Sequence, residues 1–584
     1  MEANKSLRKS CVLSTTRGSL KGIEHYDTSG RAILRRYCRV RYARAPVGNL
    51  RWRRPQPPPS DWTFNDESGL PGDYTEFGAV CPQPHYDHSV FYVEESLKTA
   101  SPSPPESEDC LFLNIWVPIG KPPPTGWPVQ FHIHGGFLQV GTANLDWLRD
   151  PTDLLSHAAP RIIVSPTYRL NLFGFLAGSE LAEIAEDPCP GNYGFWDQRE
   201  ALRWVHENIK LFHGNPNNIT VGGLSAGAYS AFYQLYYDIH QPPSERLIKR
   251  AYLWSNAVAV QPPAARSSKT TFQFSSLCDS LGIPSGLTTS EKIVRLRALP
   301  STDLVRAIAR LPYHVFRACT DGSFPQGGFV PPSFLLSLHD GSFATRMASQ
   351  GIKIMLGEVR DEAVLYKSFH APDSRDALVL QLCNDYPRGV VEALINLPMY
   401  KVPADPNSPD REAWAHAFAK IRADMQVHVS LRGLTHCLLD PPEKPGIVPL
   451  PKENIFRYRI DWRAKVLDAV FKPSCGVFHS ADIPIWWCTG YSIGYTAEDR
   501  LSARAISDPF GEFVSGSEDI GWGGDGSENT LRYLDECGKV WEGWVDPDWE
   551  RGMVVWNAVS NAQKGILGEA SRQLDPSQQL NTTA

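Results

Sequence analysis

The stretch GNYGFWDQREALRWVHENIKLFHGNPNNITVGGLSAG, residues 191–227, carries the pattern that decides the fold. Its first part predicts a helix from about Gly194 to Phe212, because apolar residues such as Val205 and Ile209 recur on one face at helical spacing. The segment NITVGG then predicts a short strand, and AGAYSAFYQLYY predicts a second helix. Helix, strand and helix in succession indicate a sheet that is covered by helices.

Further strands are predicted on either side of this unit, in LFLNIWV (111–117), VQFHIHGG (129–136), RIIVSPTYRL (161–170) and FRYRIDW (456–462). The alternation of strands and helices predicts a parallel or mixed sheet with helices on both faces. The segments near 265–345 and 370–455 turn helical and irregular, and REAWAHAFAKIRADMQVHVSLRGL is the clearest helix in them. We expect both segments to be cap-like insertions in one catalytic domain of residues 10–570. The C-terminal part is predicted to be helical.

The composition argues against several classes of protein. The chain has 584 residues, of which 42% are hydrophobic, and a formal net charge of -6, so no overall field favours nucleic acid or an anionic membrane. Eight arginines between Arg35 and Arg54 are expected to form a solvated edge around the turn APVGNLRW. The sequence has no apolar run long enough to span a bilayer, and its N-terminus lacks the apolar core of a signal peptide. We therefore expect a cytoplasmic protein, or a secreted one if the given N-terminus is incomplete.

Ser225 stands at the centre of the segment Gly223-Leu224-Ser225-Ala226-Gly227, which matches the G-x-S-x-G turn of a nucleophilic serine. Such a turn joins a strand to a helix, and its two glycines let these elements pass closely. A second match at 490–494 lies in a loop-like run, and no histidine follows position 479. Because nucleophile, acid and histidine follow one another in this order in such sites, the second match fails. The sequence predicts Ser225 as the nucleophile.

Six ordered segments extend this match: APVGNLRW with RPQPP, CPQ (81–83), EDCLFLNIW (108–116), IHGGFLQVG (133–141), PTYRLNLFGFL (166–176) and residues 191–227. Together they resemble the type-B carboxylesterases and lipases, the family that includes the cholinesterases. The resemblance covers most of the chain, and the divergent middle is similar to fungal members. It implies an α/β-hydrolase fold, with a central, mostly parallel sheet, helices on both faces and helical cap insertions. It also implies a serine esterase. From the residues themselves we expect no cofactor and no metal site.

The carboxylate of the site has three candidates. A serine hydroxyl needs a base to take its proton, and that base needs a carboxylate to orient it. The segment GIKIMLGEVRDEAVLY (351–366) offers Glu358, Asp361 and Glu362, and the residue pattern does not choose among them. The resemblance does, because the family's motif ends in an Asp-Glu pair whose glutamate is the acid. It implies Glu362.

The base is to be found among five histidines that follow Glu362, namely His370, His416, His428, His436 and His479. His416 and His428 lie on a predicted helix, and His436 comes just after it. His479 lies in CGVFHSADIPIWW, a loop-like segment after the strand FRYRIDW, which resembles the family's G-x-x-H segment. We predict His479 as the general base.

The oxyanion hole is expected from backbone N–H groups, each contributing on the order of 3–4 kcal/mol to the transition state. The resemblance assigns it to Gly136, Phe137 and Ala226. Phe137 departs from the family, which usually has glycine or alanine there. Its N–H still donates, but we expect its side chain to narrow the mouth of the site.

Two further features follow from the resemblance. Leu224 stands where the family usually has glutamate, so we expect weaker support for a cationic substrate group and no cholinesterase-like specificity. Cys81 and Cys110 match the family's first disulfide loop, although a disulfide would conflict with a cytoplasmic location. Trp486 and Trp487 are expected to pack in the core rather than to wall the acyl pocket.

The predicted function is hydrolysis of carboxylic esters of apolar or bulky small molecules through an acyl-enzyme. A lipase or an acyltransferase would use the same triad, so the sequence does not separate these activities. A non-catalytic binding protein of the same fold is the alternative from another class. Such relatives typically lose a triad member, whereas this chain retains a candidate for each. We expect a small-molecule ester as the partner, and no nucleic acid.

Overall fold

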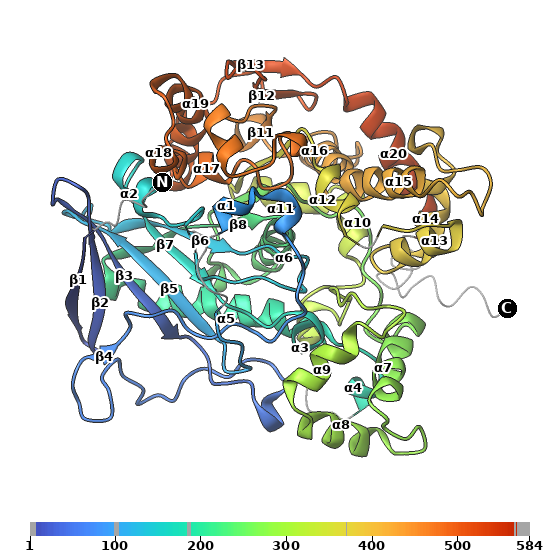
Figure 1. The fold of residues 1–584 in the computed structure, drawn as a ribbon, viewed down its shortest axis with the longest axis horizontal. Coiled ribbons are helices and arrows are strands. Elements are labelled where there is room, and N and C mark those ends of the chain that lie inside the picture. The colour runs from blue at the N-terminus through green and yellow to red at the C-terminus, as the bar shows by residue number, and fades with distance from the viewer. Residues whose placement is uncertain are drawn as a thin grey trace.

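A twisted sheet of thirteen strands forms the centre of the computed structural model, which describes residues 7–97, 104–145, 147–183, 189–369, 371–565 and 568 (Figure 1). The strands lie in the order β1-β2-β3-β5-β7-β6-β8-β9-β10-β11-β12-β13, and β4 pairs with β2. Their bounds are β1 (Arg8–Thr15), β2 (Gly18–Tyr26), β3 (Ala32–Arg41), β4 (Gly72–Asp73), β5 (Phe112–Pro118), β6 (Trp127–Ile133), β7 (Ile162–Pro166), β8 (Gly214–Leu224), β9 (Arg250–Trp254), β10 (Lys353–Val359), β11 (Ile455–Ile460), β12 (Thr530–Leu534) and β13 (Val540–Val545).

The middle of the sheet is parallel. All pairings from β7 through β6, β8, β9, β10 and β11 to β12 are parallel. The strands toward both ends pair antiparallel, except that β4 pairs parallel with β2. Every residue of β5, β6 and β7 is buried, as expected for strands covered on both faces. The prediction of a mostly parallel sheet is confirmed, and the carboxyl ends of its parallel strands share one edge.

Two helices flank the strand that leads to Ser225. Helix α5 (Tyr193–Asn208) ends earlier than predicted, and its last turn tightens into a 3-10 helix, η3 (Ile209–Phe212). His213 then adopts a left-handed backbone conformation (φ 64°) that starts β8. Helix α6 (Ala226–Ile239) follows β8 directly. The helix–strand–helix prediction for 191–227 is therefore confirmed, although β8 is longer than the segment NITVGG.

The two predicted insertions are mainly helical. The first contains α7 (Ser268–Ser280), α8 (Thr289–Ala298), α9 (Ser301–Ile308), α10 (Phe334–His339) and α11 (Ser342–Ser349), and the second contains α13 (Arg375–Cys383), α14 (Arg388–Ile395), α15 (Arg411–Ala423) and α16 (Val429–Leu439). Figure 1 shows α7–α9 and α13–α15 as separate groups beyond one side of the sheet. The domain limits of 10–570 stay a prediction, and residues 566, 567, 569 and 570 lie outside the described residues.

The helix predicted over REAWAHAFAKIRADMQVHVSLRGL changes its helical geometry near its middle. Helices α15 and α16 are continuous through a π-helical turn, η7 (Asp424–His428). This turn inserts extra backbone at a point where Asp424 is buried and accepts hydrogen bonds from Tyr400 and Arg551. π-turns of this kind are frequent at functional sites.

The sheet extends further at both ends than the sequence predicted. The arginine-rich N-terminal stretch includes β3, and the expectation of a solvated edge was wrong for Arg36 and Arg51, which are buried. Arg51 pairs with Glu108, and Arg36 donates a hydrogen bond to the carbonyl of Thr75. The C-terminal part holds α19 (Ala497–Ser515) and α20 (Trp549–Ala562), but also the strands β12 and β13.

The helices of the described part of the chain are too short or too polar to cross a lipid bilayer.

Candidate active site

Ser225 occupies a strained turn at the carboxyl end of β8. Its backbone has φ 59° and ψ −126°, a conformation that a residue with a side chain rarely adopts. The turn is fixed because the Ser225 N–H donates to the carbonyl of Trp254, at the end of the neighbouring strand β9, over 2.8 Å. Ser225 retains 8% exposure at the start of α6. The geometry is that of a nucleophile elbow.

The glycines around Ser225 allow three backbones to meet. A Cβ atom added to Gly223 or Gly227 would lie 2.2 Å or 2.0 Å from the carbonyl oxygen of Ile133, at the end of β6. A Cβ atom on Gly135 would lie 3.1 Å from the Cβ atom of Ser225. The loop after β6 therefore passes directly beside the serine.

Glu362 and His479 form a buried pair. His479 Nδ1 lies 2.5 Å from Glu362 Oε2, and the other oxygen, Glu362 Oε1, accepts a hydrogen bond from the Val359 N–H at the end of β10. Both residues are buried. The opposite ring nitrogen, His479 Nε2, is buried and has no hydrogen-bond partner among the described residues. The imidazole is therefore oriented by the carboxylate and has one nitrogen left for another partner.

Hydrogen bonds between two loops fix the relative position of Glu362 and His479. The Asp361 N–H donates to the carbonyl of Val477, and the Val477 N–H donates to the Asp361 carboxylate over 2.8 Å. Gly476 has φ 61°, and a Cβ atom there would lie 2.3 Å from Asp361 Oδ2. Asp361 thus ties the segment after β10 to the segment of His479.

Glu358, the third candidate carboxylate, belongs to a different buried network. Its carboxylate contacts Arg432 and His428 at 2.9 Å. Burial alone would raise its pKa, but Arg432 and His428 hold the pKa of Glu358 well below its usual range. Of the three carboxylates that the sequence offered, the structure brings only Glu362 against His479.

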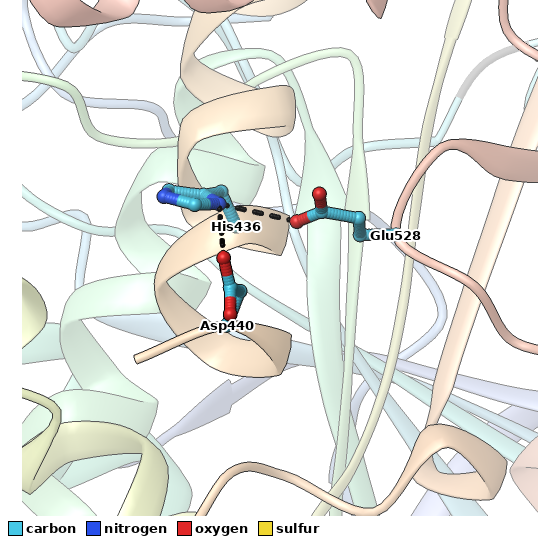
Figure 2. A group of neighbouring side chains, drawn as sticks. All are labelled: His436, Asp440 and Glu528. Atoms are coloured by element: carbon cyan, nitrogen blue, oxygen red, sulfur yellow. Dashed lines mark hydrogen bonds and ion pairs between the residues drawn. The ribbon is translucent and has the colours of Figure 1, made fainter. Parts of the chain in front are cut away.

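The other candidate histidines lie elsewhere. His428 pairs with Glu358, and His416 is exposed on α15. His436, on α16, faces Glu528 and Asp440 at 3.1 Å and 3.7 Å (Figure 2). This group offers three ligand atoms of a kind that binds metals, but such exposed acidic groups are common without a metal ion. His370 lies outside the described residues.

The loop after β6 presents backbone N–H groups beside Ser225. Gly136, Phe137 and Leu138 all have positive φ values, of 110°, 59° and 64°. The carbonyl of Gly136 accepts hydrogen bonds from the N–H groups of Gln139 and Val140, which closes a tight turn. Within the described residues, the N–H groups of Gly136, Phe137 and Ala226 donate to no protein acceptor. These are the three predicted oxyanion-hole donors.

Phe137 links this loop to the histidine. Its ring lies 6.2 Å from the ring of Tyr366, and Tyr366 lies 6.2 Å from the ring of His479. Tyr86 and Phe369 also contact Phe137, at 6.4 Å and 6.1 Å. Ring contacts of Phe137 and Tyr366 therefore link the loop beside Ser225 to the Glu362–His479 pair.

Comparison with known proteins accords with this arrangement. Residues 9–571 match the model of the carboxylesterase family. The chain belongs to the carboxylesterase family. It is 40% identical over 570 residues to an uncharacterised esterase/lipase of Schizosaccharomyces pombe, covering 96% of this chain and 98% of that protein.

Two further relatives bear activity names. A carboxylic ester hydrolase of Gibberella moniliformis is 36% identical over 561 residues, covering 95% and 97% of the two chains. A para-nitrobenzyl esterase of Bacillus subtilis is 33% identical over 368 residues, which is 62% of this chain and 64% of that one. The predicted fold class, the α/β-hydrolase fold, is confirmed, and this carboxylesterase is a carboxylic ester hydrolase that acts on small-molecule esters.

Several residues of the carboxylesterase site were not predicted from the sequence. Gln139 donates to the carbonyl of Phe137 over 3.1 Å, and Arg317 donates to the same carbonyl over 2.5 Å. Asp482 lies near Glu362 and His479, accepts a hydrogen bond from Trp486 over 2.7 Å, and is so buried that its pKa is raised to about 6. Asp482 follows His479 by three residues, which was the one available signal.

Cys81 and Cys110 lie side by side as buried thiols. Their mutual hydrogen bond and burial raise the pKa of Cys110 well above its ordinary value. Cys81 Sγ also accepts a hydrogen bond from the Leu170 N–H over 3.3 Å. The disulfide between them stays a prediction.

The two tryptophans that sequence inspection singled out pack in the interior, beside His132. Trp486 stacks on Trp254 at 4.6 Å, and Trp487 contacts His132 at 5.0 Å. The ring nitrogen of His132 hydrogen-bonds the hydroxyl of Tyr252 over 2.8 Å. The predicted core role of Trp486 and Trp487 is confirmed.

The second G-x-S-x-G match lacks the setting of an elbow. Ser492 lies on the short helix α18 (Gly490–Ile493), which follows another helix, α17 (Ile483–Trp486), and no strand. It was expected in a loop. Its N–H donates to Asp153 Oδ2 over 3.2 Å on the surface.

Proposed function

We propose that this carboxylesterase hydrolyses esters through a covalent acyl-enzyme formed on Ser225, with His479 as general base and Glu362 as the orienting carboxylate. The observation that carries the proposal is the 2.5 Å contact between His479 Nδ1 and Glu362, which leaves His479 Nε2 buried and unpartnered among the described residues. A buried polar atom without a partner is rare, and at a catalytic site it marks the position of a reacting group.

In the first half-reaction, the Ser225 Oγ attacks the ester carbonyl carbon while His479 Nε2 takes the hydroxyl proton. The positive imidazole is stabilised by Glu362, which stays ionised. Collapse of the tetrahedral intermediate breaks the bond to the alcohol, which leaves with the proton from Nε2. In the second half-reaction, water loses a proton to the same nitrogen, attacks the acyl group and releases the acid with Ser225 restored.

The N–H groups of Gly136, Phe137 and Ala226 would stabilise the negative oxygen of each tetrahedral intermediate. They donate to no other described protein group, so they are available without rearrangement. The bonds from Arg317 and Gln139 to the Phe137 carbonyl fix the orientation of the peptide groups in this loop. Preorganised donors of this kind are the largest single source of rate acceleration in many enzymes.

The aromatic side chains near Phe137 would favour apolar or bulky substrate groups. Phe91 and Phe478 stack at 5.1 Å, and Phe91 and Phe369 approach at 6.2 Å, beside the rings of Tyr86 and Phe137 already described. Leu224, next to the nucleophile, supplies no negative charge for a cationic substrate. We therefore propose that these aromatic side chains select esters without a positive charge, and that choline esters are poor substrates.

Trapping of the acyl-enzyme tests this proposal. The enzyme is mixed with p-nitrophenyl butyrate, quenched with acid within one turnover and digested for mass spectrometry. A butyryl group on the peptide of Ser225, together with a burst of p-nitrophenol, is expected. A steady release of product with no acylated peptide would exclude the covalent route, and transfer of the butyryl group to added alcohol faster than to water would indicate an acyltransferase.

A further inference from the structure

Three charged side chains from different parts of the insertions meet behind the loop of Phe137. The buried carboxylate of Asp385, between α13 and α14, contacts Arg317 at 2.7 Å and Arg422, on α15, at 2.8 Å. The side chains of both arginines are more than four-fifths buried, with 13% and 11% exposure. Two positive groups therefore share one negative group.

A third cation, Lys269, adds to the excess of positive charge. The Lys269 ammonium, on α7, donates to the carbonyls of Cys383 and Asn384, just before Asp385, over 2.7 Å and 2.8 Å. Burial lowers the pKa of this ammonium to about 8, so it is still mostly charged at neutral pH. The cluster of Lys269, Arg317, Asp385 and Arg422 thus carries excess positive charge in a low-dielectric setting, where an unbalanced charge is costly.

The cluster borders the proposed active site. Arg317 donates to the Phe137 carbonyl over 2.5 Å. The Arg422 guanidinium lies 5.8 Å from the centre of the Phe137 ring and 5.3 Å from the centre of the Tyr366 ring. Because the Tyr366 ring in turn contacts the His479 ring, Arg422 stands one aromatic ring away from the proposed base.

One hydrogen-bond donor of Arg422 has no acceptor among the described residues. This donor is its Nε–H, which is buried. In the same cluster, Arg317 Nη2 and Asp385 Oδ2 are also buried and without a hydrogen bond. Buried polar groups are almost always satisfied, so the hydrogen bonding of this cluster is incomplete, and its cationic donors could be satisfied by an added anion.

We propose that Arg422, with Arg317, binds a carboxylate carried by the ester substrate. This inference rests on the proposed function, because it assigns the substrate class of the same site. A carboxylate matches the planar donor geometry of guanidinium and restores the charge balance of the cluster. Phe137 and Tyr366 would contact the apolar chain between that carboxylate and the scissile ester. The preference for an anion also agrees with leucine at position 224.

Two pairs of esters test the proposal and locate the carboxylate. In the first pair, p-nitrophenyl hydrogen adipate carries the carboxylate in its acyl group and p-nitrophenyl heptanoate is the neutral counterpart. In the second, p-carboxyphenyl butyrate carries it in the leaving group and p-carbamoylphenyl butyrate is the neutral counterpart. The quantity measured is the ratio of kcat/KM within each pair, corrected for uncatalysed hydrolysis. Turnover of the neutral esters reports separately on the proposed ester hydrolysis.

We expect a ratio of at least about ten in one pair, and that pair shows which side of the ester carries the carboxylate. The variant Arg422→Gln should lower this ratio at least about tenfold, as expected for loss of one charge-assisted hydrogen bond. Arg551→Gln is the matched control, because Arg551 also pairs with a buried aspartate, Asp424, at 2.7 Å on the same helical insertion. It should keep the wild-type ratio. Equal rates within both pairs, or an unchanged ratio in Arg422→Gln, would overturn the proposal.

Discussion

At the scale of single residues, two buried glutamates four positions apart have different surroundings. Glu362 meets an imidazole and a backbone N–H, whereas Glu358 meets Arg432, His428 and, at 3.4 Å, Arg459. The first arrangement fits the proposed orientation of a base, and the second neutralises charges in the core. Their roles are thus set by their neighbours and not by their position in the chain.

Glu362→Gln should abolish most of the activity with little change in stability. The amide cannot stabilise the imidazolium, so we expect kcat to fall by about 10³–10⁴. Glu358→Gln is the control: it breaks a buried ion pair and should lower the free energy of unfolding by about 3 kcal/mol or more, with kcat largely kept. Ester turnover and urea unfolding of both variants provide the comparison. If Glu358→Gln lost its activity and Glu362→Gln kept it, the roles assigned to the two glutamates would be wrong.

Local sequence patterns predicted some of these residues better than others. Ser225 was predictable because its flanking glycines and the strand and helix around it are local features. The residue pattern alone did not choose among Glu358, Asp361 and Glu362, since the choice depends on contacts with segments more than 70 residues away, such as His479 and Arg432. Only the family resemblance implied Glu362. The arginines of the cluster around Asp385 gave no local signal at all.

At the scale of elements, the turn between β8 and α6 works because two glycines let three backbones touch. Gly227→Ala would place a Cβ atom 2.0 Å from the Ile133 carbonyl oxygen, so we expect a loss of about 1–3 kcal/mol or more in the free energy of unfolding. Gly286→Ala is the matched control, because a Cβ atom there meets nothing within 4 Å. Urea unfolding should separate the two variants. Equal stabilities would show that the turn has room to adjust.

The elements that local patterns identify best are the central ones. Strands β5 to β8 and helices α5 and α6 follow from apolar runs and helical spacing. Strands β1, β2, β12 and β13 lie at the ends of the sheet and are partly exposed, so their residue patterns are weak. The π-helical turn at 424–428 was not predicted either, and Asp424 in this turn is bound by Arg551, more than 120 residues away in the chain.

At the scale of the whole molecule, buried acids make stability depend on pH. Asp321 is buried while its carboxylate accepts hydrogen bonds from the N–H groups of Phe329 and Val330, and burial raises its pKa from 3.8 to about 7. Between pH 3.8 and about pH 7, the Asp321 carboxyl group is protonated in the folded state and ionised in the unfolded state. This contribution to stability is therefore present at low pH and is lost as the pH rises towards 7.

Asp321→Asn should remove this pH dependence. Relative to wild type, the variant should gain about 1–3 kcal/mol in the free energy of unfolding between pH 5 and pH 8, because an amide does not ionise. Urea unfolding of both proteins across this range measures the difference, in which all other titrating groups cancel. Two parallel curves would show that Asp321 does not titrate in this window.

The central claim is that Ser225, Glu362 and His479 converge as one catalytic unit at the carboxyl edge of the sheet. The most direct test is reaction with a fluorophosphonate probe, followed by mass spectrometry of the labelled peptide, in the wild type and in the Ser225→Ala and Ser492→Ala variants. We predict an adduct on Ser225 in the wild type and in Ser492→Ala, and none in Ser225→Ala. An adduct on any other residue of the wild type, or labelling that persists in Ser225→Ala, would contradict the account.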